Sequence, residues 1–87
     1  MNICVTGASQ GLGQELCRAL HSSGHCVWGG ARTREALERL QSDYPLRFMT
    51  SVVDIRSDVS VREWALAMQG QGFVPDAVVL NASVRLE

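Results

Sequence analysis

The sequence contains no lysine: all eight basic residues are arginines, and nine acidic residues give the chain a formal net charge of −1 at pH 7. Proteins that bind nucleic acid in general carry a basic surface. The nearly neutral balance of this chain therefore argues against a nucleic acid as its partner.

Long apolar runs are also absent. A helix that crosses a bilayer needs about 20 consecutive apolar residues, and no run here approaches that length. The first residues lack the charged start and long apolar stretch of a secretory signal. The three cysteines, Cys4, Cys17 and Cys26, lie inside apolar patterns rather than at metal-ligand spacing. They are typical of reduced core residues, so we expect a cytoplasmic protein with no membrane partner and no metal site.

The chain does contain enough apolar residues for one small domain. Of its 87 residues, 46% are hydrophobic, an ordinary fraction for a globular protein. Short apolar runs that indicate strands alternate with segments whose apolar residues recur at helical spacing. The predicted strands are residues 2–5, 26–29, 47–53 and 77–81, and the predicted helices are residues 11–23, 33–41 and a third from about residue 60.

The order β-α-β-α-β-α-β predicts an α/β domain with an open parallel sheet and helices on both of its faces. Thr33 is the expected cap of the second helix, and Ser60 with Glu63 has capping-box spacing at the start of the third. The residues predicted to face the sheet are Leu12, Leu16, Ala19 and Leu20, then Ala36, Leu37 and Leu40, then Val61, Trp64, Ala65 and Met68.

The last predicted strand is apolar from Ala77 to Leu80, which suits a strand covered on both faces of a parallel sheet. In this chain it would lie at an open edge of the sheet, and exposed edges pair with other strands. We therefore expect either self-association through this strand or its completion by the remainder of a longer chain.

The stretch TGASQGLG, residues 6–13, lies between the first strand and the first helix. A helix N-terminus presents unpaired N–H groups and a positive dipole end, which together bind a pyrophosphate. Glycines are needed where the backbone approaches the phosphates most closely. The alternative is a glycine-containing turn without a ligand. The cofactor-binding residues predicted in this loop are Thr6, Gly7, Ser9, Gln10, Gly11, Leu12 and Gly13.

Each glycine of this loop has an expected role. Gly7 permits the tight turn, Gly11 lets the backbone approach the phosphates, and Gly13 lets the helix pack close to the strand. Ser9 adds a hydroxyl to the phosphate or stabilises the turn. The pattern TGxxxGxG resembles the cofactor motif of the short-chain dehydrogenase/reductase family. The resemblance implies a Rossmann-type fold and hydride transfer between a nicotinamide cofactor and a carbonyl or alcohol substrate.

Arg32 follows the second strand, and no acidic residue occurs there until Glu35. Dinucleotide folds that choose NAD usually place an acid near this point to hold the ribose 2′-hydroxyl. An arginine suits a 2′-phosphate instead, so we predict NADP(H) over NAD(H). The alternative is a solvated surface arginine. Members of the family that prefer NADP often carry a basic residue where this chain has Gln10.

Two further segments fit the family over the rest of the chain. The resemblance implies that the side chain of Asp54 meets the adenine amino group and that the backbone of Ile55 lies near the adenine ring. The alternative for Asp54 is a helix cap. Asn81, Ala82 and Ser83 resemble the family's Asn-Asn-Ala-Gly, which implies that they pass under the cofactor ribose, although serine replaces the glycine and Leu80 replaces the first asparagine.

The resemblance places the family's catalytic serine, tyrosine and lysine in the second half of the fold. This chain has a single tyrosine, Tyr44, and no lysine, so none of its residues is assigned a catalytic role. Two hypotheses follow. Residues 1–87 are a single, partial dinucleotide-binding domain of an NADP-dependent oxidoreductase, or they are a stand-alone nucleotide-binding or interaction module without catalysis.

Overall fold

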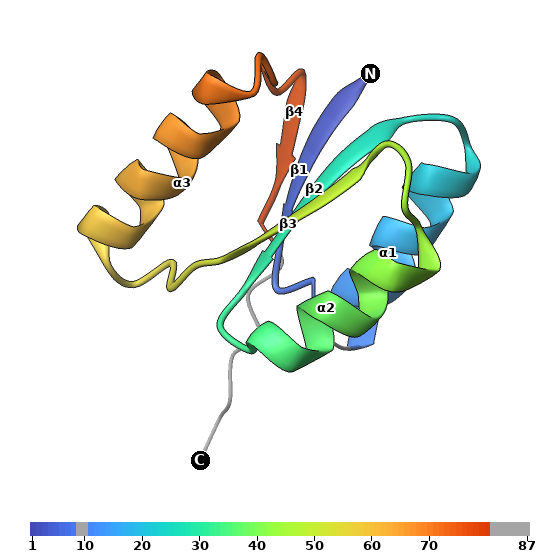
Figure 1. Ribbon diagram of the computed structural model, residues 1–87, viewed down its shortest axis with the longest axis horizontal. Helices are drawn as coiled ribbons and strands as arrows, with labels where there is room; N and C mark the ends of the chain where they lie inside the picture. The colour runs from blue at the N-terminus through green and yellow to red at the C-terminus, as the bar shows by residue number, and fades with distance from the viewer. Residues whose placement is uncertain (9–10, 81–87) are drawn as a thin grey trace.

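The computed structural model describes residues 1–8 and 11–80, in which strands and helices alternate along the chain (Figure 1). The elements are β1 (Asn2–Thr6), α1 (Gly11–Ser22), β2 (Cys26–Ala31), α2 (Arg34–Asp43), β3 (Phe48–Val52), α3 (Asp58–Gly70) and β4 (Ala77–Val79). This order confirms the predicted alternation of strands and helices.

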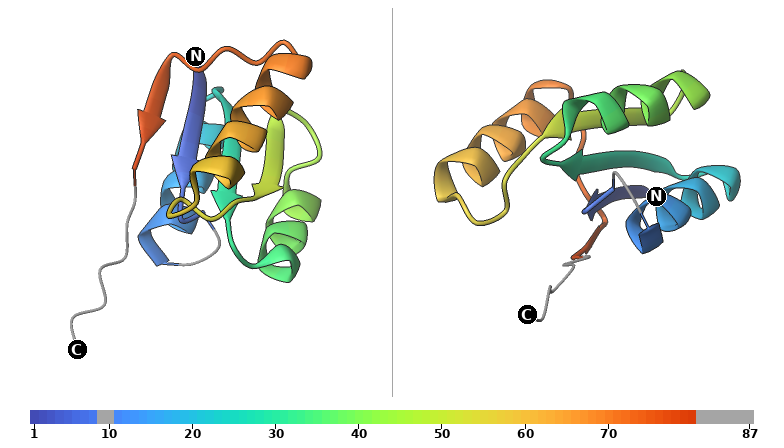
Figure 2. Two further views of the ribbon diagram at one scale, coloured as in Figure 1. Left: turned by 90° about the vertical axis from the view of Figure 1, so that its left-hand side faces the viewer. Right: turned by 90° about the horizontal axis from the view of Figure 1, so that it is seen from below.

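Within the described residues the strands form one parallel sheet of order β3-β2-β1-β4. Figure 2 shows α1 and α2 on one face of this sheet and α3 on the other. The predicted Rossmann-type α/β fold, an open parallel sheet with helices on both faces, is therefore confirmed. In the described part of the chain, no helix is long and apolar enough to cross a membrane.

Alternation along β1 divides the apolar residues between two cores. Ile3 and Val5 point to the face covered by α1 and α2, whereas Cys4 between them points to the face covered by α3. The larger core contains Ile3, Val5, Ala8, Cys17, Val27, Ala31, Leu37, Leu40 and Phe48. The smaller core contains Cys4, Trp28, Val53, Trp64, Met68 and Phe73.

Two adjacent glycines near the end of β2 allow both layers to pack closely on the strand. A Cβ atom on Gly29 would lie 2.9 Å from the Cβ of Ala8, which belongs to the loop after β1. A Cβ atom on Gly30 would lie 2.6 Å from Cγ1 of Val53 and 2.7 Å from Cη2 of Trp64. Any larger residue at Gly30 would thus displace the indole ring that holds α3 to the sheet.

The inward faces of α1 and α3 differ from their predicted stripes. Leu12 is 73% exposed and Ala19 is also exposed, because α1 approaches the sheet through the small residues Gly13 and Cys17. In α3, Val61 and Ala65 are exposed, and only Trp64 and Met68 are buried. The predicted inward positions of Leu12, Ala19, Val61 and Ala65 were therefore wrong.

The predicted helix starts also need correction. α3 begins at Asp58, and its N-cap is Ser57, whose hydroxyl accepts a hydrogen bond from the Ser60 amide at 3.2 Å. The expected capping box of Ser60 and Glu63 is therefore wrong, since Ser60 already lies within the first turn. Thr33 does occupy the N-cap of α2, but its side chain makes no capping hydrogen bond.

The third strand is shorter than predicted at its start. Arg47 has a φ of 63°, in the left-handed region, so it ends a turn and β3 begins at Phe48. The last strand lies where it was expected, at the end of the sheet next to β1. Its Val78 is 55% exposed, and Leu80 just beyond it is 76% exposed.

Candidate functional site

Those predicted binding residues that the structure describes lie at the carboxyl ends of the strands. In open parallel α/β sheets, ligands bind outside these ends at the point where the strand order reverses. Here β2 and β3 lie on one side of β1 and β4 lies on the other, so the order reverses between β1 and β4. The loop that leaves β1 at this point is the glycine-rich loop.

Two glycines give this loop its shape. Gly7 has a φ of 65° and Gly11 a φ of 59°, conformations that side chains with a Cβ adopt only with strain. The predicted tight turn at Gly7 is therefore confirmed. A Cβ placed on Gly11 would meet no described atom within 4 Å, so the space beside the start of α1 is open. Ser9 and Gln10 lie outside the described residues.

The start of α1 is suited to an anion. Its first turn contains no acidic residue, so its N–H groups and positive dipole end are not neutralised locally. Gly13 is buried, as expected of a glycine that lets the helix pack on the strand. Leu12 is 73% exposed, which contradicts its place in the predicted core stripe, and its assignment to the cofactor stays a prediction.

Thr6 anchors the base of the loop. Its side chain is buried, and its hydroxyl donates to the carbonyl oxygen of Val79 at 3.5 Å. This contact joins the ends of β1 and β4 on the two sides of the point where the strand order reverses. The floor of the candidate site is thereby fixed by residues of two neighbouring strands.

Arg32 and Asp54 follow neighbouring strands at the same end of the sheet. The amide of Val53 donates to the carbonyl oxygen of Ala31 at 2.8 Å, so the residues that come next are brought side by side. Arg32 is exposed, and within residues 1–8 and 11–80 it forms no ion pair. The positive charge of Arg32 is one of the causes of the lowered pKa of the Asp54 carboxyl.

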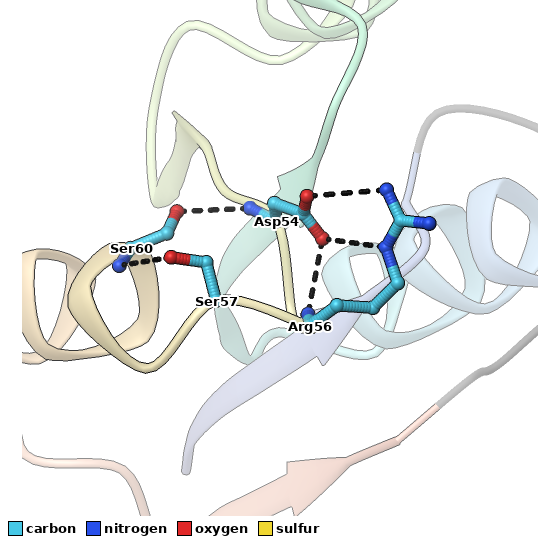
Figure 3. Close-up of polar contacts among 4 residues, drawn as sticks. All are labelled: Asp54, Arg56, Ser57 and Ser60. Carbon is cyan, nitrogen blue, oxygen red and sulfur yellow. Dashed lines mark hydrogen bonds and ion pairs between the residues drawn. The ribbon is translucent and has the colours of Figure 1, made fainter.

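The carboxylate of Asp54 is held by Arg56 (Figure 3). Oδ1 accepts from the backbone amide of Arg56 at 3.0 Å and from its Nε at 3.2 Å, and Oδ2 accepts from Nη2 at 3.3 Å. The side-chain hydrogen bonds are the largest cause of the lowered pKa of Asp54, and the backbone hydrogen bond is the next. Asp54 is therefore a firmly ionised group at neutral pH.

The backbone of Asp54 is fixed by the start of α3. Its amide donates to the hydroxyl of Ser60 at 2.9 Å, and the amide of Ser60 in turn donates to the hydroxyl of Ser57 (Figure 3). Ser57 therefore caps the helix, and Asp54 does not, which answers the alternative interpretation of Asp54. Ile55, next to it, is 47% exposed at the surface of this loop.

The sequence alone predicted no role for Arg56 or Ser57. The spacing of Asp54 and Arg56 offers a signal for the first, because an aspartate side chain often accepts from the backbone amide two residues later. The bidentate arrangement of the Arg56 guanidinium adds to that turn and was not readable from spacing alone.

Two further predictions from the sequence concern the cofactor ribose and the tyrosine. Asn81, Ala82 and Ser83 lie outside the described residues. Tyr44 follows α2 at the opposite end of the sheet, where its ring lies 4.5 Å from that of His21 and 5.6 Å from that of Phe48. In the part of the chain that the structure describes, no group of three or more histidine, cysteine or acidic residues is placed to hold a metal ion.

Known proteins resemble this chain in sequence and in fold. The NADPH-dependent pterin aldehyde reductase of Arabidopsis thaliana is 38% identical over 82 residues, which cover 92% of this chain and 34% of that protein. The NADP-dependent 3-hydroxy acid dehydrogenase of Salmonella typhi is 29% identical over 86 residues, which cover 99% of this chain and 35% of that protein. The chain thus spans about a third of the length of these relatives.

A solved structure has the same fold as this chain. Serine dehydrogenase from Escherichia coli superposes with a TM-score of 0.92 at 27% identity, over 99% of this chain and 39% of that one. The sequence model of the family described as short chain dehydrogenase matches residues 1–87. Since that match includes every residue, the chain belongs to the short chain dehydrogenase family.

Proposed function

We propose that this chain is the NADP(H)-binding part of a reductase or dehydrogenase that moves a hydride between a nicotinamide cofactor and a carbonyl or alcohol substrate. The observation that carries this proposal is the exposed charge of Arg32 just after β2. This strand pairs with β1, which leads through the glycine-rich loop into the acid-free start of α1. The names of the two relatives above, an NADPH-dependent reductase and an NADP-dependent dehydrogenase, support the choice of NADP(H).

The proposed cofactor contacts follow the chain along the ends of the strands. The pyrophosphate is held at the start of α1, the 2′-phosphate by Arg32, the adenine by Asp54 and Ile55, and the ribose by Asn81, Ala82 and Ser83. The loop residues assigned to the pyrophosphate are Gly7, Ser9, Gln10, Gly11, Leu12 and Gly13, with Thr6 at the base of the loop.

When bound, the cofactor supplies or accepts the hydride, and the residues of this chain bind and orient it. The described residues offer no proton-transferring pair near the strand ends, since Tyr44 lies at the opposite end of the sheet and the sequence has no lysine. We therefore propose that proton transfer belongs to residues beyond these 87, as the family resemblance implies.

The second candidate is a non-catalytic module that binds a nucleotide or a partner. Two observations favour it: the missing acid–base pair and the apolar β4, which ends the sheet with Val78 half-exposed. We propose that the 87-residue chain, expressed alone, self-associates through this edge. A longer reading frame with a tyrosine and a lysine four residues apart would favour the enzyme, and a stop codon after Glu87 would favour the module.

Titration with NADP⁺ and NAD⁺ tests the choice of cofactor. Two to three charge-assisted hydrogen bonds to a 2′-phosphate, each worth about 1.5–3 kcal/mol, give NADP⁺ a clear margin. Arg32→Asp should remove that margin. Arg47→Asp makes the same change of charge just before β3, at the end of the sheet away from Arg32, and should preserve the margin. A preference of the unmodified protein for NAD⁺ would refute the proposal.

A further inference from the structure

The candidate site contains a negative charge beside the place proposed for a phosphate. Asp54 is ionised, and the Val53–Ala31 hydrogen bond puts it next to Arg32 at the end of the neighbouring strand. A 2′-phosphate held by Arg32 carries about two negative charges near neutral pH. Without a neighbouring positive charge, the carboxylate of Asp54 would repel this phosphate. It would have little effect on NAD(H), whose 2′-hydroxyl is uncharged.

Arg56 is placed to remove this repulsion. Its guanidinium covers both oxygens of the Asp54 carboxylate, and its backbone amide adds a third hydrogen bond (Figure 3). A carboxylate has about four acceptor positions, so a position remains for an amino group of the adenine. With Arg56, the group formed by Arg32, Asp54 and Arg56 is positively charged overall; without Arg56 it is neutral.

We propose that Arg56 is a specificity-determining residue that favours NADP(H) by neutralising Asp54, without contacting the 2′-phosphate itself. This inference rests on the proposed function, because it takes Arg32 as the residue that holds the phosphate. Arg56 acts through another residue and is therefore a positioning residue. The Ser60 and Ser57 hydrogen bonds keep the loop in the conformation in which Asp54 and Arg56 meet.

Neutralisation and direct contact make different predictions, which a double variant separates. Arg56→Gln removes the positive charge and leaves Asp54 ionised, so the affinity for NADP⁺ should fall about tenfold while that for NAD⁺ stays within about twofold. Adding Asp54→Asn removes the repelling charge as well, so the preference for NADP⁺ should return. Arg56→Lys keeps the charge and should retain most of the preference.

Isothermal titration calorimetry measures the affinity for NADP⁺ and for NAD⁺, with the substitutions made in the protein that contains these residues. Arg47→Gln is the matched control, because it removes one arginine charge at the opposite end of β3. Melting of the cofactor-free variants should change little, since an exposed ion pair contributes little to stability.

Three results would overturn the inference. Equal losses for both cofactors in Arg56→Gln would make Arg56 a general support of the adenine site. An unchanged ratio of affinities would remove it from specificity altogether. A double variant whose ratio of NADP⁺ affinity to NAD⁺ affinity stays as low as that of Arg56→Gln would mean that Arg56 contacts the phosphate directly. In each case the unmodified protein still prefers NADP⁺, whereas failure of the proposed function shows as a preference for NAD⁺ before any substitution.

Discussion

The two faces of the sheet are covered unequally. On one face, α1 and α2 bury a continuous core in which Val5, Cys17 and Val27 are completely inaccessible and Leu37, Leu40 and Phe48 nearly so. On the other face, α3 contributes only Trp64 and Met68 to the smaller core. Figure 2 shows α3 over the middle of the sheet, with β4 left uncovered at its edge.

Apolar side chains remain in solvent around the second face. Val59, Val61 and Leu66 of α3 are 64%, 41% and 60% exposed, and Val78 of β4 is 55% exposed. The difference teaches that α1 and α2 bury more apolar side chains than α3 does. Leu12 of α1 is also 73% exposed, but most of the exposed large apolar side chains on the helices belong to α3. The candidate site draws on both faces, because the glycine-rich loop leads into α1 and the loop of Asp54 leads into α3.

The largest expected effect on stability is found by comparing a buried leucine of α2 with an exposed leucine of α3. Leu40→Ala empties a position that is 1% exposed in α2, and should lower the free energy of unfolding by about 2–5 kcal/mol. Leu66→Ala makes the same change at an exposed position of α3 and should stay within about 0.5 kcal/mol. Urea denaturation of both variants measures the contrast. Equal losses would show that α3 is covered in solution and that the comparison of the two faces is wrong.

The second prediction compares two glycines. Gly11→Val places a branched side chain in the open space beside the start of α1 and should weaken cofactor binding more than tenfold, a change of about 1.4 kcal/mol or more. Gly70→Val changes the last residue of α3, where a Cβ also meets no described atom within 4 Å, and should leave binding unchanged. Fluorescence titration with NADPH gives both affinities, and circular dichroism checks that both variants fold. Similar losses would contradict the phosphate-binding role of the glycine-rich loop.

The third prediction concerns the edge of the sheet. Alone, the 87-residue chain should self-associate through β4, and Val78→Lys should shift it toward monomer, because a lysine on an edge strand opposes further pairing. Leu12→Lys is the control, since it adds the same charge at a side chain that is 73% exposed on α1. Size-exclusion chromatography with light scattering over a concentration series reports the mass. A stable monomer that unfolds cooperatively at high temperature would show that this edge needs no partner.

Sequence alone was sufficient where the cause is local. Gly7 has a positive φ, as its place between the first strand and the first helix predicted. The apolar runs placed all four predicted strands to within a few residues, because strand residues must be apolar where they are buried.

Sequence was insufficient where several neighbouring residues compete for one role or where contacts come from another strand. Ser57 and Ser60 both suit a helix cap, and only the path of the loop after Val53 decides between them. Leu12 fits the helical stripe, but the close approach of Gly13 and Cys17 turns it outward. The packing of Trp64 against Gly30 joins residues 34 positions apart, so no local pattern announces it.

The smallest expected effect is a difference in alkylation rate between two buried cysteines, one on each face of the sheet. Burial raises the pKa of Cys17, on the buried face of α1, to about 12, and that of Cys4, on the side of α3, to about 11. Both thiols are therefore protonated at neutral pH and react only when the structure opens locally. Because α3 holds its face through few side chains, that face should open at a lower free energy, and Cys4 should be alkylated faster than Cys17.

Timed alkylation with mass spectrometry of the resulting peptides measures both rates, with the half-buried Cys26 as an internal reference that reacts first. Because the folded-state pKa values lie above the ordinary value of 9.0, the stability that these protonated thiols contribute is present below pH 9 and is lost as the pH rises toward 11 and 12. Labelling of both should therefore accelerate over that range.

Gly30→Ala, which pushes against Trp64, should speed the labelling of Cys4 more than that of Cys17. If Cys17 reacts as fast as Cys4 in the unmodified chain, the two faces open together and the weaker cover over the α3 side has no consequence for local stability.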